Sequence, residues 1–219
     1  MSQITLPLHC NQCEQTAHGT SCDINGRAGV CGKDIDVQSL QEILLYGLKG
    51  MAAYAHHARR LGKHSEEVSA FIEEALFATM TNVNFDIPTL LELVMLCGTH
   101  NLTVMQLLQE GHIDCFGQPE PASVMMGTQE GPGILITGHD LLDLMNVLKQ
   151  CEGTNVKVYT HGEMLPGHMY PKIHNHPNMA GHFGGPWQKQ KVEFGQFPGA
   201  ILGTTNCILH PKDTYASRM

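Results

Sequence analysis

The chain has 219 residues, 42% of them hydrophobic, and a formal net charge of −8 at pH 7. These values suit one large domain or two small ones with real cores, and an acidic, mixed surface argues against nucleic acid, whose phosphates bind to basic patches. No apolar stretch approaches the ~20 residues of a membrane span, and the N-terminus lacks the basic start and apolar core of a signal peptide. We therefore expect a cytoplasmic protein with no nucleic-acid or membrane partner.

Residues 9–35 form a loop without helical or strand periodicity that contains four of the eight cysteines. These are Cys10, Cys13, Cys22 and Cys31. In the cytoplasm, clustered cysteines more often bind metal than form disulfides, and a loop with no apolar face of its own needs a metal or similar group to hold it. Four thiolates suit either zinc or an iron–sulfur cluster. One close pair followed by two single cysteines favours iron–sulfur, because zinc sites more often use two close pairs.

Three amphipathic helices are expected after this loop, over residues 37–61, 66–80 and 88–108. Asp36 and Ser65 are candidate N-caps of the first two helices, and Pro88 occupies a favoured first-turn position of the third. The third helix contains Gly98, near which we expect a break. Three helices joined by short loops predict an antiparallel bundle.

The pattern changes after the third helix to short apolar strands, at residues 133–138, 156–160 and 200–203. An amphipathic helix between the first two strands completes a strand–helix–strand unit, which predicts a parallel sheet. We interpret residues 161–198 as irregular. The histidines of residues 161–182 could form a surface metal patch, but exposed loop histidines are the favoured interpretation and we assign them no role.

The expected fold class is therefore α plus α/β. Residues 1–112 are assigned to the cysteine loop and the three-helix bundle. Residues 113–132, which contain three prolines, are assigned to a linker. Residues 133–219 are assigned to the start of a Rossmann-like parallel α/β domain.

Three residues with metal-binding side chains directly follow the three predicted strands. They are His139, Glu163 and Cys207. Each has an ordinary interpretation by itself: a helix cap, a solvated acid and a small buried side chain. Functional groups collect at the carboxyl ends of parallel strands, so their coincidence predicts one shared site. A mixed nitrogen, oxygen and sulfur set suits an iron centre with an open position for substrate.

Six stretches carry a resemblance to a known family: CNQCEQT (10–16), VCGK (30–33), LFATMTNVNFD (76–86), GILITGHD (133–140), VYTHGEMLP (158–166) and TTNC (204–207). Together they resemble the hybrid-cluster protein family, also called prismane or hydroxylamine reductase. The resemblance implies that Cys10, Cys13, Cys22 and Cys31 hold a conventional cluster, [4Fe-4S] in some members and [2Fe-2S] in others. It also implies that His139, Glu163 and Cys207 are ligands of a second, hybrid [4Fe-2O-2S] cluster.

The resemblance further implies an oxidoreductase that reduces hydroxylamine, or nitric oxide, with electrons from an external donor protein. Family members continue for hundreds of residues and supply three more cysteines and a glutamate to the hybrid cluster. We therefore expect a truncated or split form that is inactive alone and associates with itself or with a complementary C-terminal chain. The alternative is an electron-transfer or metal-sensing module that uses only the N-terminal cluster.

Overall fold

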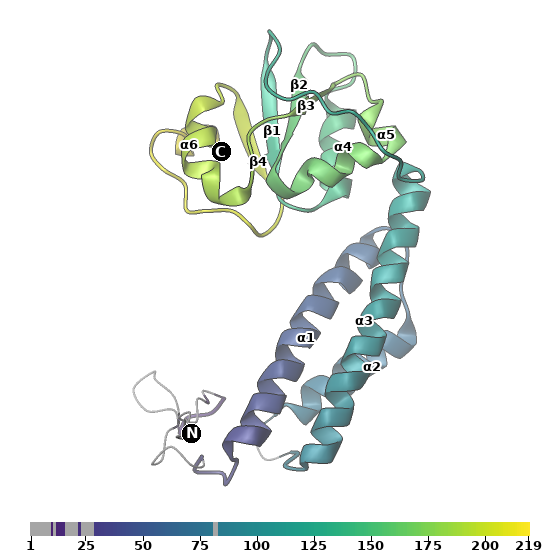
Figure 1. Cartoon of the computed structure of the whole chain (residues 1–219), viewed down its shortest axis with the longest axis vertical. Coiled ribbons are helices and arrows are strands. Elements are labelled where there is room, and N and C mark those ends of the chain that lie inside the picture. The colour runs from purple at the N-terminus through teal and green to yellow at the C-terminus, as the bar shows by residue number, and fades with distance from the viewer. Residues whose placement is uncertain (1–9, 11, 16–21, 23–28, 81–82) are drawn as a thin grey trace, which may run out of the picture. The chain divides into compact units, whose positions relative to one another are not determined.

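The computed structural model describes residues 10, 12–15, 22, 29–80 and 83–219 (Figure 1). The chain forms two compact units, Met1–Glu110 and Gly111–Met219. The irregular loop expected at residues 9–35 lies largely outside the described residues. The first unit is otherwise helical and the second is built on a parallel sheet, which confirms the expected α plus α/β class.

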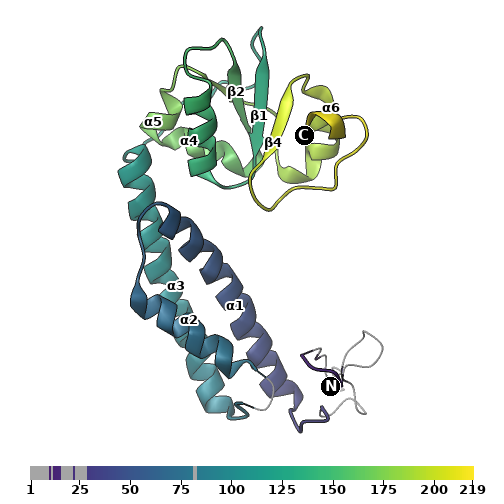
Figure 2. The ribbon, with the colours of Figure 1, turned by 180° about the vertical axis from the view of Figure 1, so that it is seen from behind.

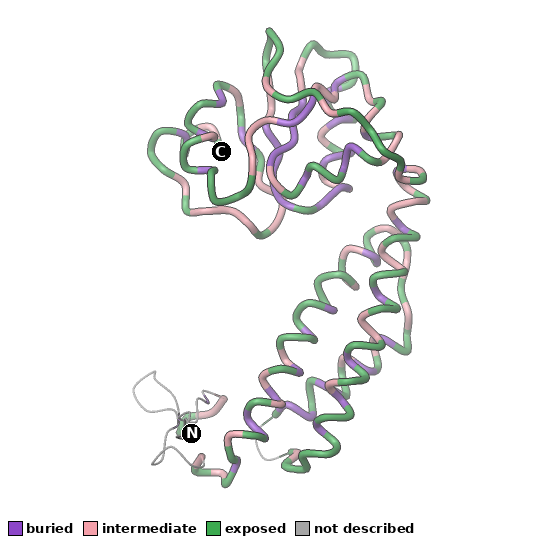
Figure 3. Tube along the Cα trace, viewed as in Figure 1, coloured by how far each residue is buried: buried purple, intermediate pink, exposed green. Residues whose placement is uncertain are grey.

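The helices of the first unit are α1 (Ile35–Arg60), α2 (Glu66–Ala78) and most of α3 (Ile87–Phe116), whose residues from Gly111 onward belong to the second unit. They form the expected bundle, in which consecutive helices run in opposite directions (Figures 1 and 2). Leu48, Met51, Phe71 and Leu93 are buried in its common core, and the buried residues recur along the inward faces of the helices (Figure 3). Burying each such side chain contributes about 1.5–3 kcal/mol.

The starts of α1 and α2 are set by capping side chains. Asp34 caps α1 by accepting a hydrogen bond of 2.9 Å from the backbone N–H of Val37. Asp36, the cap expected from the sequence, instead lies in the first turn of the helix. There its negative charge interacts favourably with the positive end of the helix dipole. Ser65 caps α2 as expected, accepting from the N–H of Val68 at 3.3 Å.

Helix α3 runs unbroken through Gly98, so the expected break is wrong; one glycine costs a helix only about 1 kcal/mol. By length and composition α3 could cross a membrane, since an 18-residue window has a mean hydropathy of 1.2, with 22% of that window buried. Glu92 and His100 interrupt the apolar residues of this helix, so the sequence shows no uninterrupted apolar run of membrane length here. Leu93 and Val104 of this helix are buried in the bundle.

The sheet of the second unit contains β1 (Gly133–Thr137), β2 (Lys157–His161), β3 (Met179–His182) and β4 (Ala200–Gly203). All pairs are parallel, and the strand order is β3-β2-β1-β4. The sequence correctly predicts β1, β2 and β4 but not β3. Because β4 lies beside β1, the first and last strands are neighbours, and β1 stands between β2 and β4.

The segment expected to be irregular, residues 161–198, is largely ordered. Besides β3 it contains η2 (Gly162–Met169), α5 (Pro171–His174), η3 (Trp187–Lys189) and α6 (Gln190–Gln196). The remaining elements of this unit are α4 (Leu141–Gln150) and η4 (Ala216–Arg218). Helices α4 and α6 lie on opposite sides of the sheet (Figures 1 and 2), and Leu135, Tyr159 and Ile201 pack with Phe194 of α6.

Candidate metal centres

Three neighbouring strands end at the same level of the sheet. The last residue of β1 pairs with the last residue of β2 and with the last residue of β4. His139 and Glu163 lie two residues beyond this level, and Cys207 lies four residues beyond it. The backbone therefore brings all three predicted ligands to the carboxyl edge of the sheet, where open α/β sheets hold their ligands.

His139 and Cys207 face each other across β1 and β4. The Sγ atom of Cys207 lies 4.0 Å from Nε2 of His139. The other ring nitrogen, Nδ1, lies 3.2 Å from Oγ1 of Thr205, which also accepts a 2.8 Å hydrogen bond from the backbone N–H of His139. A hydroxyl oxygen can accept from both N–H groups, and that tautomer leaves the Nε2 lone pair available for a metal.

The backbone at Cys207 has an unusual conformation. Its φ is 64°, the one positive φ among the non-glycine residues that the structure describes; such conformations cluster at functional sites. The side-chain amide of Gln190, which is fully buried, holds this turn. It donates to the carbonyl of Cys207 at 2.6 Å and accepts from the N–H of Leu209 at 3.0 Å. Gln190 is thus a positioning residue that sequence reasoning missed.

Glu163 opens η2, and its side chain is exposed. Among the described residues, no three His, Cys, Asp or Glu side chains surround a single ion position, so Glu163 does not join His139 and Cys207 around one point. An iron–sulfur cluster distributes its protein ligands over several irons, so its ligands need only share an edge. The donor set at this edge fits such a cluster better than one tetrahedral zinc ion.

The four N-terminal cysteines are all described and none forms a disulfide. Cys10 and Cys22 are buried and joined by a 2.7 Å hydrogen bond from the N–H of Cys22 to the carbonyl of Cys10. Cys31 lies in a tight turn that is closed by a 2.8 Å bond from the N–H of Gly29 to the carbonyl of Lys33. Among the described residues, no three of these cysteines surround a single ion position, but four free thiols in a short segment are the donor set of an iron–sulfur cluster.

Three histidines expected to be exposed are buried instead, because they line the sheet. His161, His168 and His182 are 0%, 2% and 3% exposed. His161 donates or accepts at both ring nitrogens, with Oε2 of Glu193 at 2.9 Å from Nε2 and Oγ1 of Thr137 at 3.3 Å from Nδ1. Burial lowers the pKa of His161, and the Glu193 carboxylate opposes that shift.

Thr160 of β2 joins the other two buried histidines. Its hydroxyl lies 2.8 Å from Nε2 of His168 and 2.9 Å from Nδ1 of His182. Burial, reinforced by His182 and His174, lowers the pKa of His168 to about 4. Local composition does not reveal this network, because its partners come from β2, η2 and β3.

We expect the second unit to lose stability as pH falls from about 6.5 to 4. In this window the unfolded chain protonates His168 but the folded chain does not, so stability is fully present above the unfolded pKa and falls with pH, by up to about 3 kcal/mol. Trp187, the single tryptophan, reports urea unfolding of this unit. His168→Asn should reduce the change of unfolding free energy with pH, whereas the same substitution at exposed His210 should leave that change as in wild type. If both variants show the same pH dependence of stability, His168 is not its source.

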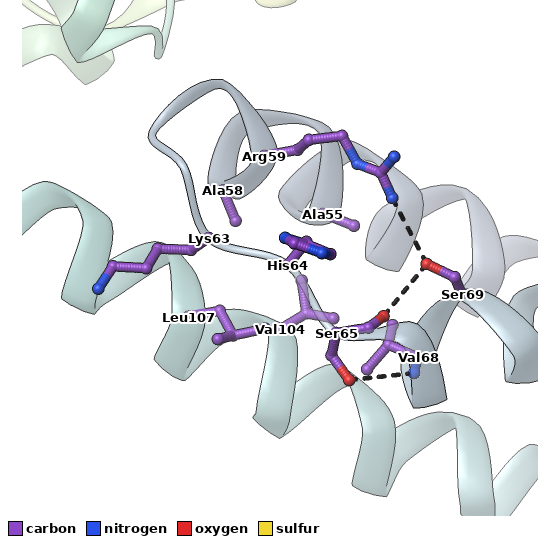
Figure 4. A pocket seen from close by; sticks show the side chains of 10 residues that line it. All are labelled: Ala55, Ala58, Arg59, Lys63, His64, Ser65, Val68, Ser69, Val104 and Leu107. Carbon is purple, nitrogen blue, oxygen red and sulfur yellow. Dashed lines mark hydrogen bonds between the residues drawn. The ribbon is translucent and has the colours of Figure 1, made fainter.

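A pocket in the first unit lies at the connection between α1 and α2 (Figure 4). Arg59 contacts Oγ of Ser69 at 3.5 Å there, and Ser69 donates to the carbonyl of Ser65 at 3.1 Å. Its lining is otherwise mainly aliphatic, with His64 as the one metal-binding type of side chain and no cysteine. Its lining therefore offers no donor set like those of the cysteine segment and the sheet edge.

The parallel sheet has nitrogen, oxygen and sulfur donors at its carboxyl edge, and four free cysteines precede the helical bundle. These are the donor types of a metal-binding protein. The model of the Prismane/CO dehydrogenase family matches residues 8–95 and 86–219. The chain belongs to this family, whose members include iron–sulfur oxidoreductases.

Curated relatives agree with this assignment. The chain is 56% identical over 212 residues to a hydroxylamine reductase of Moorella thermoacetica, a match that covers 97% of this chain and 49% of the relative. It is 49% identical over 212 residues to a hydroxylamine reductase of Methanothermobacter thermautotrophicus, with the same two coverages. The chain thus spans about half the length of these relatives.

Solved structures show the same fold. Carbon monoxide dehydrogenase IV from Carboxydothermus hydrogenoformans superimposes with a TM-score of 0.71 at 14% identity, covering 94% of this chain and 47% of that one. A carbon monoxide dehydrogenase from Thermococcus sp. AM4 gives a TM-score of 0.68 at 15% identity, covering 94% and 47%. At such low identity the likeness concerns the fold alone.

Proposed function

We propose that this chain forms part of a hybrid-cluster oxidoreductase that reduces hydroxylamine to ammonia. The reaction consumes two electrons and two protons and releases water together with ammonia. The single observation that carries the proposal is the approach of Cys207 Sγ to His139 Nε2 at 4.0 Å, at the strand edge that also presents Glu163. The names of the relatives, hydroxylamine reductase, point to the same substrate.

The N-terminal cysteines would take electrons from an external donor protein. Cys10, Cys13, Cys22 and Cys31 would hold a [4Fe-4S] or [2Fe-2S] cluster in this role. Two of these thiols are buried and two are half-buried, so a cluster held by them would lie close to the surface, within reach of a donor. This arrangement supports an electron entry point in the first unit.

His139, Glu163 and Cys207 would be ligands of the hybrid [4Fe-2O-2S] cluster. When bound, its iron supplies a Lewis acid for the N–O bond of hydroxylamine. Thr205 fixes the ring of His139, and Gln190 holds the turn of Cys207. The exposed carboxylate of Glu163 leaves this ligand free to adjust as the cluster is assembled. Nitric oxide is the second substrate to be tested, and a cytoplasmic location is proposed.

The rest of the hybrid-cluster ligands would come from a complementary segment. The relatives are about twice the length matched here, and we propose that their second half supplies three cysteines and a glutamate, either in one polypeptide or as a separate chain. The 219-residue chain alone should then bind only its N-terminal cluster and reduce no hydroxylamine. Addition of the complementary half should restore activity, and robust turnover without it would show the proposal wrong.

The second candidate function is an electron-transfer or metal-sensing module. It is favoured by one observation: the four N-terminal cysteines are all present here, while the edge of the sheet presents three donors. Iron content separates the two functions. About four irons in the assembled protein, or about two if the N-terminal cluster is [2Fe-2S], fits the module. About four irons more than that, with paramagnetic signals of a mixed cluster, fits the reductase.

Thr205→Val should lower hydroxylamine reduction by the assembled protein about 10–100-fold, because outer partners of a ligating histidine fix its ring and tautomer. The hydroxyl lies 3.2 Å from Nδ1 of His139. Thr205→Ser keeps the hydroxyl and should restore most of the rate, while the N-terminal cluster spectrum stays constant in both variants. Full activity of Thr205→Val would show that this hydroxyl does not position His139.

A further inference from the structure

Lys33 is a buried lysine near the end of the cysteine loop of residues 9–35. It lies two residues after Cys31, and its side chain belongs to the fully buried set, with 1% exposure. Its Nζ donates a 2.8 Å hydrogen bond to Oε1 of Gln41, which is itself 1% exposed. The amide of Gln41 in turn donates to the carbonyl of Asn84 at 3.3 Å. The lysine head group is therefore fixed between the cysteine turn and the helical bundle.

The hydrogen-bond partner of the Lys33 ammonium group is the neutral amide of Gln41. Within the described part of the chain, no carboxylate lies at ion-pair distance from its ammonium group. The neighbouring acid, Asp34, is exposed and uses its carboxylate to cap α1. Lysine is almost never fully buried without a paired charge, since removing an unpaired ion from water costs several kcal/mol. Among the described residues, the site of Lys33 therefore lacks the anion that a buried ammonium group requires.

The four cysteines identify the chemistry of that anion. Four thiolates around either a [4Fe-4S] or a [2Fe-2S] core leave the site with a net negative charge. Lys33 and Cys31 belong to one turn, closed by the bond from the N–H of Gly29 to the carbonyl of Lys33 at 2.8 Å. Because Lys33 is only two residues from Cys31 in the chain, its charge would lie near a cluster that Cys31 helps to hold, whichever cluster type is bound.

We propose that Lys33 is the internal counter-charge of the iron–sulfur cluster held by Cys10, Cys13, Cys22 and Cys31, and that it raises the reduction potential of that cluster. The inference rests on the proposed function only in requiring the N-terminal cluster. Reduction adds one electron to an already negative site, so a fixed cation favours the reduced form. Lys33 thereby makes the cluster easier to reduce by the external donor.

The test compares the midpoint potential of the cluster in three variants by spectroelectrochemistry. Lys33→Gln removes the charge and keeps a hydrogen-bonding amide, Lys33→Arg keeps the charge, and Lys49→Gln removes an exposed charge from α1 as the matched control. At an effective dielectric constant of about 20, a unit charge about 10 Å away changes the ratio of reduced to oxidised cluster roughly tenfold. For a one-electron couple this is a 59 mV shift.

Lys33→Gln should therefore shift the midpoint potential downward by about 59 mV, the equivalent of that tenfold ratio, and Lys33→Arg should stay close to wild type. Lys49→Gln should also stay close, because water and salt screen an exposed charge. Equal potentials in Lys33→Gln and wild type would overturn the proposal, as would equal shifts in Lys33→Gln and Lys49→Gln. Absence of any iron–sulfur spectrum in the wild type would instead refute the N-terminal cluster and with it the proposed function.

A second readout needs no cluster. In the metal-free chain the ammonium of Lys33 has lost its proposed counter-charge, so Lys33→Gln should leave the bundle at least as stable as wild type in urea, monitored by helical circular dichroism. If Lys33→Gln binds no cluster although its metal-free bundle is fully stable, the negative cluster requires the charge of Lys33, which supports its role as counter-charge. A strongly destabilised metal-free variant would show that Lys33 serves the bundle through Gln41 and would overturn the inference.

Discussion

Replacing Cys13 by serine should remove the visible sulfur-to-iron absorption of the anaerobically prepared protein and most of its iron. Four thiolate ligands hold the cluster in this account, and serine oxygen is a poor substitute for a soft thiolate ligand. Both Cys13 and Cys115 are half-buried free thiols, so Cys115→Ser is the matched control. That control should keep the full spectrum, because Cys115 lies at the end of α3, outside the cysteine segment.

The same result should hold for each of the other three cysteines in turn. The buried pair, Cys10 and Cys22, is matched by the buried and unrelated Cys151. Iron retained in Cys13→Ser, or iron lost to the same extent in Cys115→Ser, would disprove the assignment of the N-terminal segment.

The second large effect is expected at the edge of the sheet. His139→Ala in the protein assembled with its complementary half should reduce hydroxylamine turnover by at least about 100-fold, since loss of a ligand should exceed the 10–100-fold cost of losing an outer partner. The N-terminal cluster should be unaffected. Cys207→Ser should behave alike, because its Sγ lies 4.0 Å from the same histidine nitrogen.

Non-additivity gives the sharper form of this experiment. If His139 and Cys207 serve one centre, the double variant should be hardly less active than either single variant, as for catalytic groups that act as a unit. The control is His176→Ala, which should retain activity. His176 does not lie at this edge of the sheet, and its Nε2 lies 3.3 Å from Oε1 of Glu152. Effects of His139 and Cys207 that multiply independently would contradict a shared centre.

Much of the fold follows from apolar patterning. Strands β1 and β4 are short apolar runs, β2 contains the adjacent pair Val158 and Tyr159, and the three helices have apolar faces. Their positions are therefore visible in the sequence. Strand β3 is not, because Met179–His182 is four residues long and contains a glycine and a histidine. Its pairing with β2 comes from the tertiary contacts of the sheet, including the Thr160 hydroxyl between His168 and His182.

The candidate site was predictable in outline only. A strand-end rule predicts His139, Glu163 and Cys207 at one edge of the sheet, and the register of β1 with its neighbours places them there. The contact between His139 and Cys207 depends on β4 lying beside β1, a strand order that no local pattern encodes. The left-handed backbone of Cys207 and the clamp from Gln190 are likewise products of the turn after β4.

The buried polar residues show why local patterns fail at such sites. Histidines in a glycine- and proline-rich segment have the composition of an exposed loop, yet His161 is fully buried and paired with Glu193. Similarly, Lys33 follows Gly32 and precedes Asp34 and Asp36. In such a polar stretch a solvated lysine side chain is the ordinary expectation. His161 is held by Thr137 and Glu193, which are distant in the sequence, and Lys33 is bonded to Gln41 on the following helix.

The most direct test of the central claim is the content of iron and acid-labile sulfide per chain, measured with the visible spectrum on anaerobically purified protein. The account expects about four irons and an equal amount of sulfide for a [4Fe-4S] cluster, or about two of each for a [2Fe-2S] cluster, in the isolated 219-residue chain. Stoichiometric zinc without labile sulfide, or a folded chain that binds no iron when all four cysteines are reduced, would contradict it.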